Sequence, residues 1–241
     1  MPALPDARAR VAAQSWYHTL DLGDGLVTPG WFDLRPHVRH YGLPERLDGL
    51  RVLDVGTWDG FWAFELERRG AEVVALDVDH EADYDWPPRR RPAEPKALDR
   101  GAGFRLAKEI LGSRVERVAC NLYEATPERL GGTFDLVFCG AVLLHLRDQL
   151  LALERLAGLC RGRLVLADEY DRLTSLLPVS VSRYRADRDA AVVFWLPSRR
   201  TWRRMVWTAG FEDVREHGRF TVRIPGARIP HVVIHARGTA A

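Results

Sequence analysis

Residues 52–70 read VLDVGTWDGFWAFELERRG and have the pattern of a strand, a tight turn and a helix. The apolar run contains Asp54, the turn is bounded by Gly56 and Gly60, and an amphipathic segment follows. Backbone amides and a helix N-terminus converge at such a turn, which therefore predicts a ligand site. Trp58 stands where a phosphate-binding turn would carry its middle glycine, so the ligand of this turn needs its own explanation.

The chain beyond this turn alternates short apolar runs with amphipathic segments, which is typical of a parallel sheet covered by helices. Strands are predicted at 51–55, 72–77, 114–119, 134–139, 163–168, 211–218 and 231–236. Helices are predicted at 60–69, 101–111, 147–157 and 198–209. Glycine stops are expected at Gly210 for the last helix and at or just before Gly162 for the third. The sequence thus predicts an α/β fold, a Rossmann-like three-layer sandwich.

The composition is that of a globular protein. Of the 241 residues 46% are hydrophobic, and the formal net charge of +2 does not point to nucleic acid as a partner. Three widely spaced cysteines in or beside apolar runs predict buried free thiols in a reducing compartment. No segment reads as a membrane span, a signal peptide or a clustered set of metal ligands. We expect a cytoplasmic protein, monomeric or homodimeric, with no metal and no membrane attachment.

Two stretches interrupt the alternation and are predicted to cover the carboxyl ends of the strands, where open α/β sheets bind ligands. The first is an N-terminal lid segment, residues 1–48, which precedes the main domain at 49–241 and is rich in aromatic residues, Gly and Pro. The second spans residues 169–197. Residues 80–99 are rich in Pro and in charge and predict a surface loop.

The charges around the turn distinguish two classes of ligand. Asp77 ends the second strand, where a carboxylate binds the ribose of a dinucleotide or of S-adenosylmethionine. A pyrophosphate would be repelled by Asp54 and Asp59, by roughly 1 kcal/mol at ~4 Å in bulk water and by more near a protein surface. S-adenosylmethionine carries a sulfonium and an ammonium and no phosphate, so the same carboxylates favour it. Asp59 is also predicted to be the N-cap of the 60–69 helix.

Three stretches of this chain, VLDVGTWDG, VVALD and FDLVFCGAVLLHLRD, resemble in sequence and order the motifs of the class I S-adenosylmethionine-dependent methyltransferases. The resemblance covers residues 50–170 and implies a seven-stranded sheet with an antiparallel last hairpin, with S-adenosylmethionine as cofactor. It implies a methionine end shaped by Asp54, Gly56 and Gly60, a ribose on Asp77, an adenine flanked by Asn121 and Leu122, and closure of the pocket by Gly140. Thr57, Trp58 and Val78 complete the implied cofactor-binding set.

A narrower resemblance concerns TPGWFDLRP (28–36), YGLP (41–44) and LLHLRD (143–148), which look like a group related to bacterial tRNA wobble-uridine carboxymethyl-transferring enzymes. In those enzymes a tyrosine before the histidine contacts the extra carboxylate of a carboxylated cofactor. This chain has Leu144 before His145, and leucine cannot hydrogen-bond a carboxylate. Ordinary S-adenosylmethionine is therefore favoured.

His145 and His18 are the candidate general bases, because imidazole titrates near neutral pH. The alternative for His145 is a structural ring that positions its loop. The alternative for His18 is that its N-terminal segment is a cap that only fills the gap above the sheet. Trp58 is either a wall beside the cofactor, with a cation–π contact to it, or a ring that points into the N-terminal lid. The predicted acceptor-binding residues are Tyr17, Trp31, Tyr170, Arg183 and Tyr184.

Together these features predict in-line transfer of a methyl group to a small-molecule acceptor, in a specialised-metabolite pathway, with proximity supplying most of the acceleration. Two alternatives stay open. One is an enzyme that modifies the wobble uridine of tRNA. The other is a protein that binds S-adenosylmethionine without catalysis.

Overall fold

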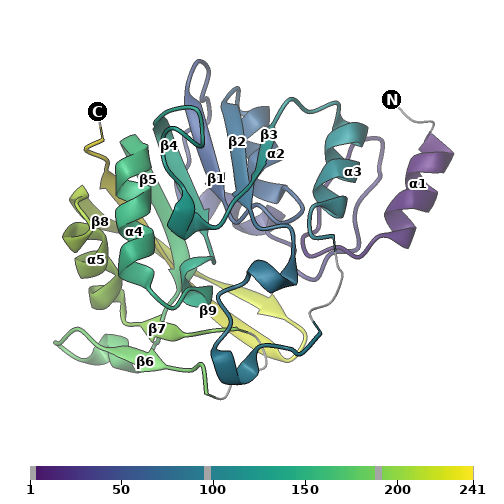
Figure 1. The fold of residues 1–241 in the computed structure, drawn as a ribbon. Coiled ribbons are helices and arrows are strands. Elements are labelled where there is room, and N and C mark those ends of the chain that lie inside the picture. Colours follow the sequence, from purple (N-terminus) through teal and green to yellow (C-terminus); the bar gives the residue numbers. More distant parts are fainter. Residues whose placement is uncertain (1–3, 95–98, 188–191, 241) are drawn as a thin grey trace.

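A seven-stranded sheet forms the centre of the computed structural model, which describes residues 4–94, 99–187 and 192–240 (Figure 1). The strand order is β3-β2-β1-β4-β5-β9-β8, parallel from β3 to β5 and antiparallel across β9 and β8. The strands are β1 Arg51–Val55, β2 Glu72–Asp77, β3 Glu116–Ala119, β4 Phe134–Gly140, β5 Cys160–Glu169, β8 Glu212–Ile224 and β9 Ala227–Arg237. All seven predicted strands and the antiparallel last hairpin are confirmed.

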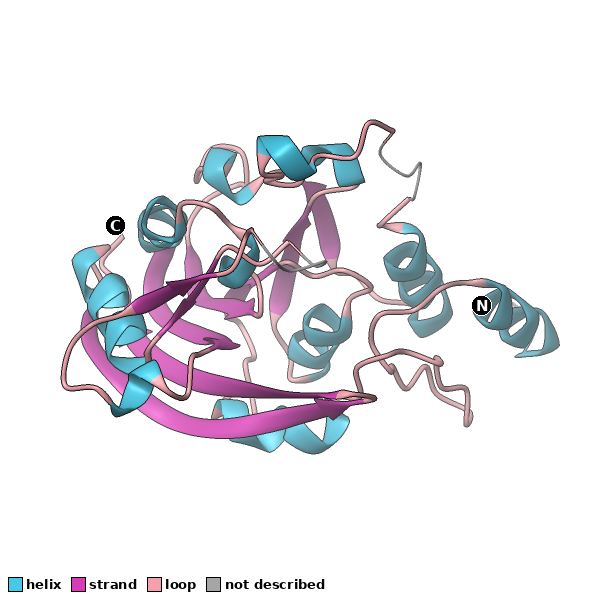
Figure 2. Ribbon diagram, turned by 90° about the horizontal axis from the view of Figure 1, so that it is seen from below, coloured by secondary structure: helices cyan, strands magenta, loops and turns pink. Residues whose placement is uncertain are grey.

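Helices lie on both faces of this sheet and complete the three layers (Figure 2). They are α2 Phe61–Arg68, α3 Ala102–Leu111, α4 Gln149–Leu159 and α5 Arg199–Thr208, whereas α1 Leu4–Ala13 lies outside the sheet beside α3. Successive strand side chains point to opposite faces: Val52 packs into the core shared with α2 and α3, and Leu53 into the core shared with α4 and α5. The predicted Rossmann-like sandwich and its four helices are confirmed, whereas α1 was not predicted.

The end of α4 corrects one expectation. The helix does end before Gly162, at Leu159, but this glycine is not its stop residue, because β5 begins at Cys160 and contains it. A Cβ on Gly162 would lie 2.1 Å from the Asp135 carbonyl oxygen. The glycine is therefore needed for a close strand contact, beside an irregularity in the β4–β5 register. At the end of α5 the prediction is confirmed, since Gly210 has φ 104°.

The segments outside the sheet form short elements. The N-terminal segment contains the 3₁₀ helix η1 Arg35–Tyr41 and contributes buried residues such as Trp16 and Leu20 to the α2-side core. The predicted second cover holds an unpredicted two-stranded sheet, β6 Ser182–Tyr184 and β7 Trp195–Pro197, although its residues 188–191 lie outside the described ones. The remaining 3₁₀ helices are η2 Glu81–Asp83, η3 Pro88–Arg90, η4 Leu122–Glu124, η5 Leu143–His145 and η6 Thr174–Leu176.

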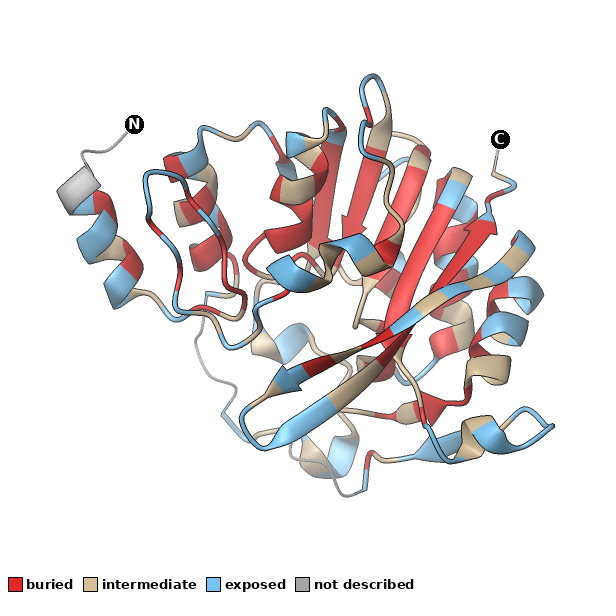
Figure 3. Cartoon of the chain, turned by 180° about the vertical axis from the view of Figure 1, so that it is seen from behind, coloured by how far each residue is buried: buried red, intermediate tan, exposed pale blue. Residues whose placement is uncertain are grey.

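The central strands are buried, whereas α1 and α5 keep an exposed side (Figure 3). Glu169, the last residue of β5, pairs with His231 of β9, so the β8–β9 hairpin continues beyond the carboxyl end of β5. Cys120, Cys139 and Cys160 are buried free thiols, as predicted. Within the described ranges, no helix is long and apolar enough to cross a membrane.

Two tryptophans of α5 provide a test of this packing. Trp202 is fully buried and its indole donates to the Glu169 carbonyl at 2.9 Å, whereas Trp207 is 69% exposed. We expect Trp202→Ala to lower the free energy of unfolding by about 3–5 kcal/mol, because it leaves a cavity. Trp207→Ala should stay within about 0.5 kcal/mol of the wild type. Urea denaturation of both variants measures the difference, and equal losses would contradict the assignment of Trp202 to the core.

Candidate active site

The glycine turn, residues 56–60, joins β1 to α2 at the carboxyl edge of the sheet. Gly56 (φ 74°) and Gly60 (φ 95°) adopt the left-handed conformation, which favours glycine. A Cβ on Gly56 would lie 2.3 Å from Cγ2 of Val142, so this position has no room for a side chain. The Gly56 amide donates to the Leu76 carbonyl at 2.8 Å, and the turn is thereby tied to the end of β2.

Asp54, in β1 just before this turn, is 1% exposed. Burial raises the pKa of its carboxyl to about 7, the nearby Asp77 carboxylate adds to this shift, and the Ala63 amide opposes it. Asp54 Oδ2 and Thr57 Oγ1 are buried and have no hydrogen-bond partner in the described part of the chain. A ligand that brings a positively charged donor would satisfy both atoms, so this pair fits the ammonium of a bound S-adenosylmethionine.

Asp77, at the end of β2, has a double role. Its Oδ2 accepts from the Trp58 amide and its Oδ1 from the Val78 amide, both at 2.7 Å. Burial raises the pKa of this carboxyl, while the two amides, Arg117 and Arg100 lower it. Each carboxylate oxygen keeps a second lone pair, so Asp77 can hold the turn in place and still accept hydrogen bonds from a ribose diol.

Trp58 has a positive φ of 50° although it is not glycine. Its indole stacks on the Tyr17 ring, with ring centroids 4.4 Å apart. The guanidinium carbon of Arg100 lies over the Trp58 ring, 4.2 Å from its centroid. The Trp58 ring thus points toward the N-terminal segment, which was one of the two predicted orientations. Its cation–π partner in this structure is Arg100. Arg100 also lies over the Tyr84 ring at 4.7 Å.

Asp59 is not the N-cap of α2, which corrects the prediction from the sequence. The N-cap is Gly60, with no side-chain hydrogen bond. The Asp59 carboxylate instead accepts from the backbone amides of Tyr17 and His18 at 2.8 and 2.9 Å and lies 2.5 Å from His18 Nδ1. Three donors from the N-terminal segment outcompete the helix amides, so this side chain fastens the segment to the glycine turn.

The predicted adenine side lies at the end of β3. Leu122 is buried, and the side chain of Asn121 caps η4 by accepting from the Tyr123 amide at 3.0 Å. The Asn121 amide also donates to the Asp83 carbonyl at 3.3 Å. Residues 80–94, here called the strap, thus pack against the end of β3, whereas the sequence predicted only a surface loop.

The loop after β4 carries the first candidate base. Gly140 ends the strand, and Ala141 after it has a positive φ of 55°. His145 Nδ1 bonds to the Val192 carbonyl, and burial lowers the pKa of its imidazole. The ring thus joins η5 to the segment that leads into β7, which is the geometry of the positioning alternative.

Asp168, at the end of β5, is a further buried carboxyl at the carboxyl edge of the sheet and was not predicted from the sequence. It is fully buried and accepts from the Leu143 amide at 2.9 Å and from the Glu169 amide at 2.7 Å. Burial raises the pKa of its carboxyl to about 8. The signal was present, because Asp168 follows an apolar run just as Asp54 and Asp77 do.

The five predicted acceptor-binding residues fall into two groups. Tyr17 packs between Trp58 and Phe32, and Trp31, also in the N-terminal segment, is 76% exposed. The other three follow β5. They are Tyr170, whose amide donates to the Pro230 carbonyl at 3.2 Å; Arg183, paired with Asp171 at 2.9 Å; and Tyr184, 50% exposed with its ring against Trp195. Among the described residues, no hydrogen bond, ion pair or ring contact joins the two groups.

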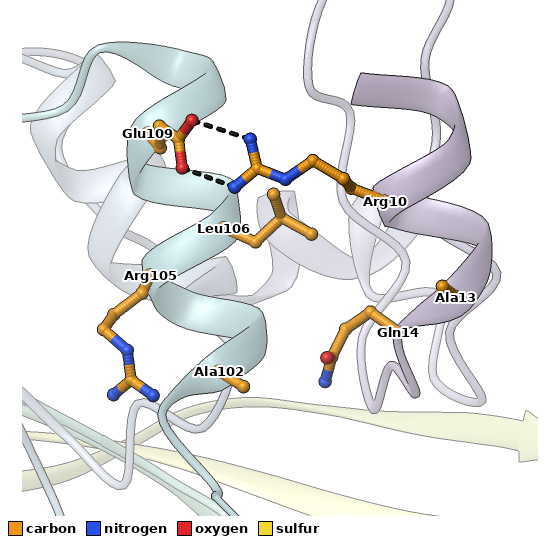
Figure 4. A pocket seen from close by; sticks show the side chains of 7 residues that line it. All are labelled: Arg10, Ala13, Gln14, Ala102, Arg105, Leu106 and Glu109. Atoms are coloured by element: carbon orange, nitrogen blue, oxygen red, sulfur yellow. Dashed lines mark hydrogen bonds and ion pairs between the residues drawn. The ribbon is translucent and has the colours of Figure 1, made fainter. Parts of the chain in front are cut away.

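A separate groove lies between α1 and α3 (Figure 4). Arg10 and Glu109 bridge it through two hydrogen bonds of 2.7 and 2.6 Å. Its lining comes from these two helices and Gln14 and includes none of the strand-end residues, so it is not part of the candidate site. The described ranges contain no group of three or more His, Cys, Asp or Glu residues able to hold a metal ion.

Comparisons with known proteins identify a family and two fold relatives. A methyltransferase-domain family matches residues 33–216. A tRNA U34 carboxymethyltransferase of Alcanivorax borkumensis is 32% identical over 191 residues, 77% of this chain and 50% of that protein. This chain thus spans about half the length of that relative.

Two solved structures share the fold. One is the N-terminal domain of EvdMO1 in the presence of SAH and D-fucose, with a TM-score of 0.69 and 18% identity over 99% of this chain and 98% of that one. The other is the 1,6-didemethyltoxoflavin-N1-methyltransferase of Burkholderia thailandensis with bound 1,6-didemethyltoxoflavin and S-adenosylhomocysteine. It has a TM-score of 0.53 and 19% identity over 80% of this chain and 72% of that one.

The raised pKa of Asp54, about 7, gives a test of the cofactor site. Below this pKa the carboxyl is protonated and does not attract an ammonium, so we expect the affinity for S-adenosylmethionine to rise about tenfold per unit between pH 5 and 6.5 and to level off above 7. Asp54→Asn should bind weakly at every pH in this range, while Asp168→Asn should keep the rise. Isothermal titration calorimetry measures it, and a flat wild-type profile would contradict the role of Asp54.

Proposed function

The chain belongs to the class I S-adenosylmethionine-dependent methyltransferases, and we propose that it methylates a small-molecule acceptor. The observation that carries this proposal is that three segments over the strand ends are bonded to one another. Arg90 of the strap donates to the Ala186 carbonyl at 2.9 Å, and the Phe194 amide donates to the Leu144 carbonyl at 2.8 Å. A site covered in this way suits a small molecule, whereas a polynucleotide needs an open basic surface.

The strap also reaches the loop after β4. Its Asp85 carboxylate accepts from the Arg147 amide at 2.7 Å and from the Tyr123 hydroxyl at 2.9 Å. One aspartate thus connects the strap to the ends of both β3 and β4. This connection supports a roof over the cofactor, with the acceptor entering between the strap, the N-terminal segment and the β8–β9 hairpin.

Bound S-adenosylmethionine supplies an electrophilic methyl group. We assign Asp54, Thr57 and the glycine turn to its methionine end, Asp77 to its ribose, and Val78, Asn121 and Leu122 to its adenine. The chain then holds an acceptor atom in line with the methyl, and this positioning accounts for most of the acceleration. Tyr17, Trp31, Tyr170, Arg183 and Tyr184 are proposed to select the acceptor.

The proposal includes a place in specialised metabolism and a cytoplasmic location. Two fold relatives support the acceptor class, since one was solved with a bound didemethyltoxoflavin and the other in the presence of D-fucose. Leu144, which is buried in η5, supports ordinary S-adenosylmethionine because it offers no hydrogen bond to an additional carboxylate.

Calorimetry with S-adenosylmethionine and S-adenosylhomocysteine tests the cofactor assignment. We expect Asp77→Ala to weaken binding of both by about 10- to 100-fold, the value of a lost hydrogen bond to a charged group. Glu72→Ala, at the exposed opposite end of β2, should bind as the wild type does. Equal affinities for the two variants would refute the role of Asp77.

The methyl-transfer step is tested separately, by incubating the protein with S-adenosylmethionine and a metabolite extract. We expect a mass increase of one methyl group in a small molecule. Cofactor binding without methylation of any acceptor would instead support the non-catalytic alternative.

A tRNA substrate is the second candidate, supported by the Alcanivorax borkumensis relative and by one surface feature. Arg200, Arg203 and Arg204 line a groove beside the exposed ring of Trp207 on α5. No ion pair of these arginines is found among the described residues. Guanidinium groups beside an exposed indole suit a phosphate backbone with stacked bases.

Salt dependence separates the two acceptors. For a small-molecule enzyme we expect weak tRNA binding with little dependence on salt, whereas several phosphate contacts make binding fall steeply as salt rises. Filter binding of unmodified tRNA between 50 and about 200 mM salt measures the slope. A steep slope that is lost in the triple variant Arg200→Ala, Arg203→Ala and Arg204→Ala would favour tRNA.

A further inference from the structure

His18 and Asp59 form a buried pair directly beside the glycine turn. Nδ1 of His18 lies 2.5 Å from Asp59 Oδ1, and both side chains are almost fully buried. Because a carboxylate can only accept, Nδ1 of the neutral ring carries the proton and Nε2 carries the lone pair. Nε2 has no hydrogen-bond partner among the described residues, yet it is not one of the fully buried unpartnered atoms. Nε2 therefore keeps a free lone pair and some exposed surface.

The position of this pair is set from two sides. The preceding residue, Tyr17, stacks on Trp58 of the turn. The His18 ring lies 5.7 Å from the ring of Phe61, the first residue of α2. His18 is thus one side-chain layer from the turn to which we assign the methionine end of the cofactor, and it belongs to the segment over the strand ends.

We propose that His18, oriented by Asp59, is the general base of this enzyme and that its acceptor is a hydroxyl group. The inference rests on the proposed methyltransferase function and adds the acceptor class. A base is needed only where the acceptor atom must lose a proton to become a nucleophile, as an alcohol or a phenol must. A carboxylate on one imidazole nitrogen and a free lone pair on the other is the arrangement that serves this purpose.

The step balances in atoms and charge. The acceptor oxygen gives its proton to His18 Nε2 and forms a bond to the methyl carbon. The bond from that carbon to sulfur breaks, its electron pair stays on sulfur, and the product is the neutral thioether S-adenosylhomocysteine. The positive charge passes to the imidazolium, which the buried Asp59 carboxylate stabilises until the proton leaves to solvent.

The charges disfavour a role for His18 as an anchor for an anionic group. With a neutral ring the pair carries one negative charge, and with a protonated ring it carries none. Asp54 and Asp77 lie around the same turn. An anion would therefore gain no net attraction at Nε2.

Two variants separate a base from a structural contact. In His18→Asn the amide nitrogen can still donate to Asp59, so the segment stays fastened while the Nε2 lone pair is lost. In Asp59→Asn the amide oxygen can still accept from the two backbone amides, and the NH₂ group then faces His18 Nδ1. That donor moves the ring proton to Nε2, and the lone pair is no longer available to the acceptor. Asp24→Asn, on an exposed turn of the same segment, is the matched control.

The assay uses S-adenosylmethionine with phenol, benzyl alcohol and 4-nitrophenol at a pH at which only the last is ionised, and it measures S-adenosylhomocysteine. We expect both variants to lose about 10²- to 10⁴-fold in kcat on phenol and benzyl alcohol. They should lose much less on 4-nitrophenolate, which needs no base. The affinity for S-adenosylhomocysteine should equal that of the wild type and of Asp24→Asn.

Nitrogen NMR of labelled histidine gives a readout that needs no turnover. We expect a proton on Nδ1 of His18 in the wild type and on Nε2 in Asp59→Asn. A proton on Nε2 in the wild type, equal losses on all three acceptors, or weaker binding of S-adenosylhomocysteine as the main effect would overturn the assignment. Methylation confined to nitrogen or carbon atoms in the metabolite extract would also overturn it. If the wild type binds no cofactor or methylates nothing, the proposed function itself fails, whatever the NMR result.

Discussion

The Asp77 carboxylate is the contact on which the geometry of the site depends. By accepting from the Trp58 amide at 2.7 Å, it holds in the left-handed region a bulky residue that would avoid it in a free chain. This conformation turns the indole toward Tyr17 and leaves the next residue, Asp59, to bind the N-terminal segment. One strand-end carboxylate therefore shapes the glycine turn and, through it, sets where the N-terminal segment lies.

The sheet and its helices could be predicted from the sequence because their signals are local and periodic. Alternate residues of a strand meet opposite helix layers, so runs such as VVAL (73–76) are apolar on both faces. Where a contact between distant residues decides, the local signal misleads. Gly162 resembles a helix stop but is needed beside the Asp135 carbonyl.

The candidate site likewise contains residues that local sequence patterns predict and residues whose contacts come from distant parts of the chain. The positions of Asp54, Asp77 and the two turn glycines follow from the strand–turn–helix pattern, because neighbouring parallel strands end at the same edge of a sheet. The partner of Asp59 could not be predicted, since its competitors for hydrogen bonding lie more than 40 residues away in the sequence. Asp168 follows an apolar run, which is visible in the sequence. Its hydrogen bond from the Leu143 amide is not, because it forms only where the loop after β4 folds against the end of β5.

The buried carboxyls have opposite consequences for folding and for binding. Asp54 and Asp168 have pKa values raised to about 7 and 8 by burial, so each stabilises the ligand-free fold only while it is protonated. That contribution is complete below the unfolded pKa near 4 and declines as the pH rises toward the folded value. The amides that donate to Asp168 favour its ionised form and so oppose the effect of burial. Asp54 has an unpartnered oxygen, so a cation bound there would favour the ionised form and recover part of the stability that burial costs. Binding of a cationic ligand would then be coupled to the fold at neutral pH.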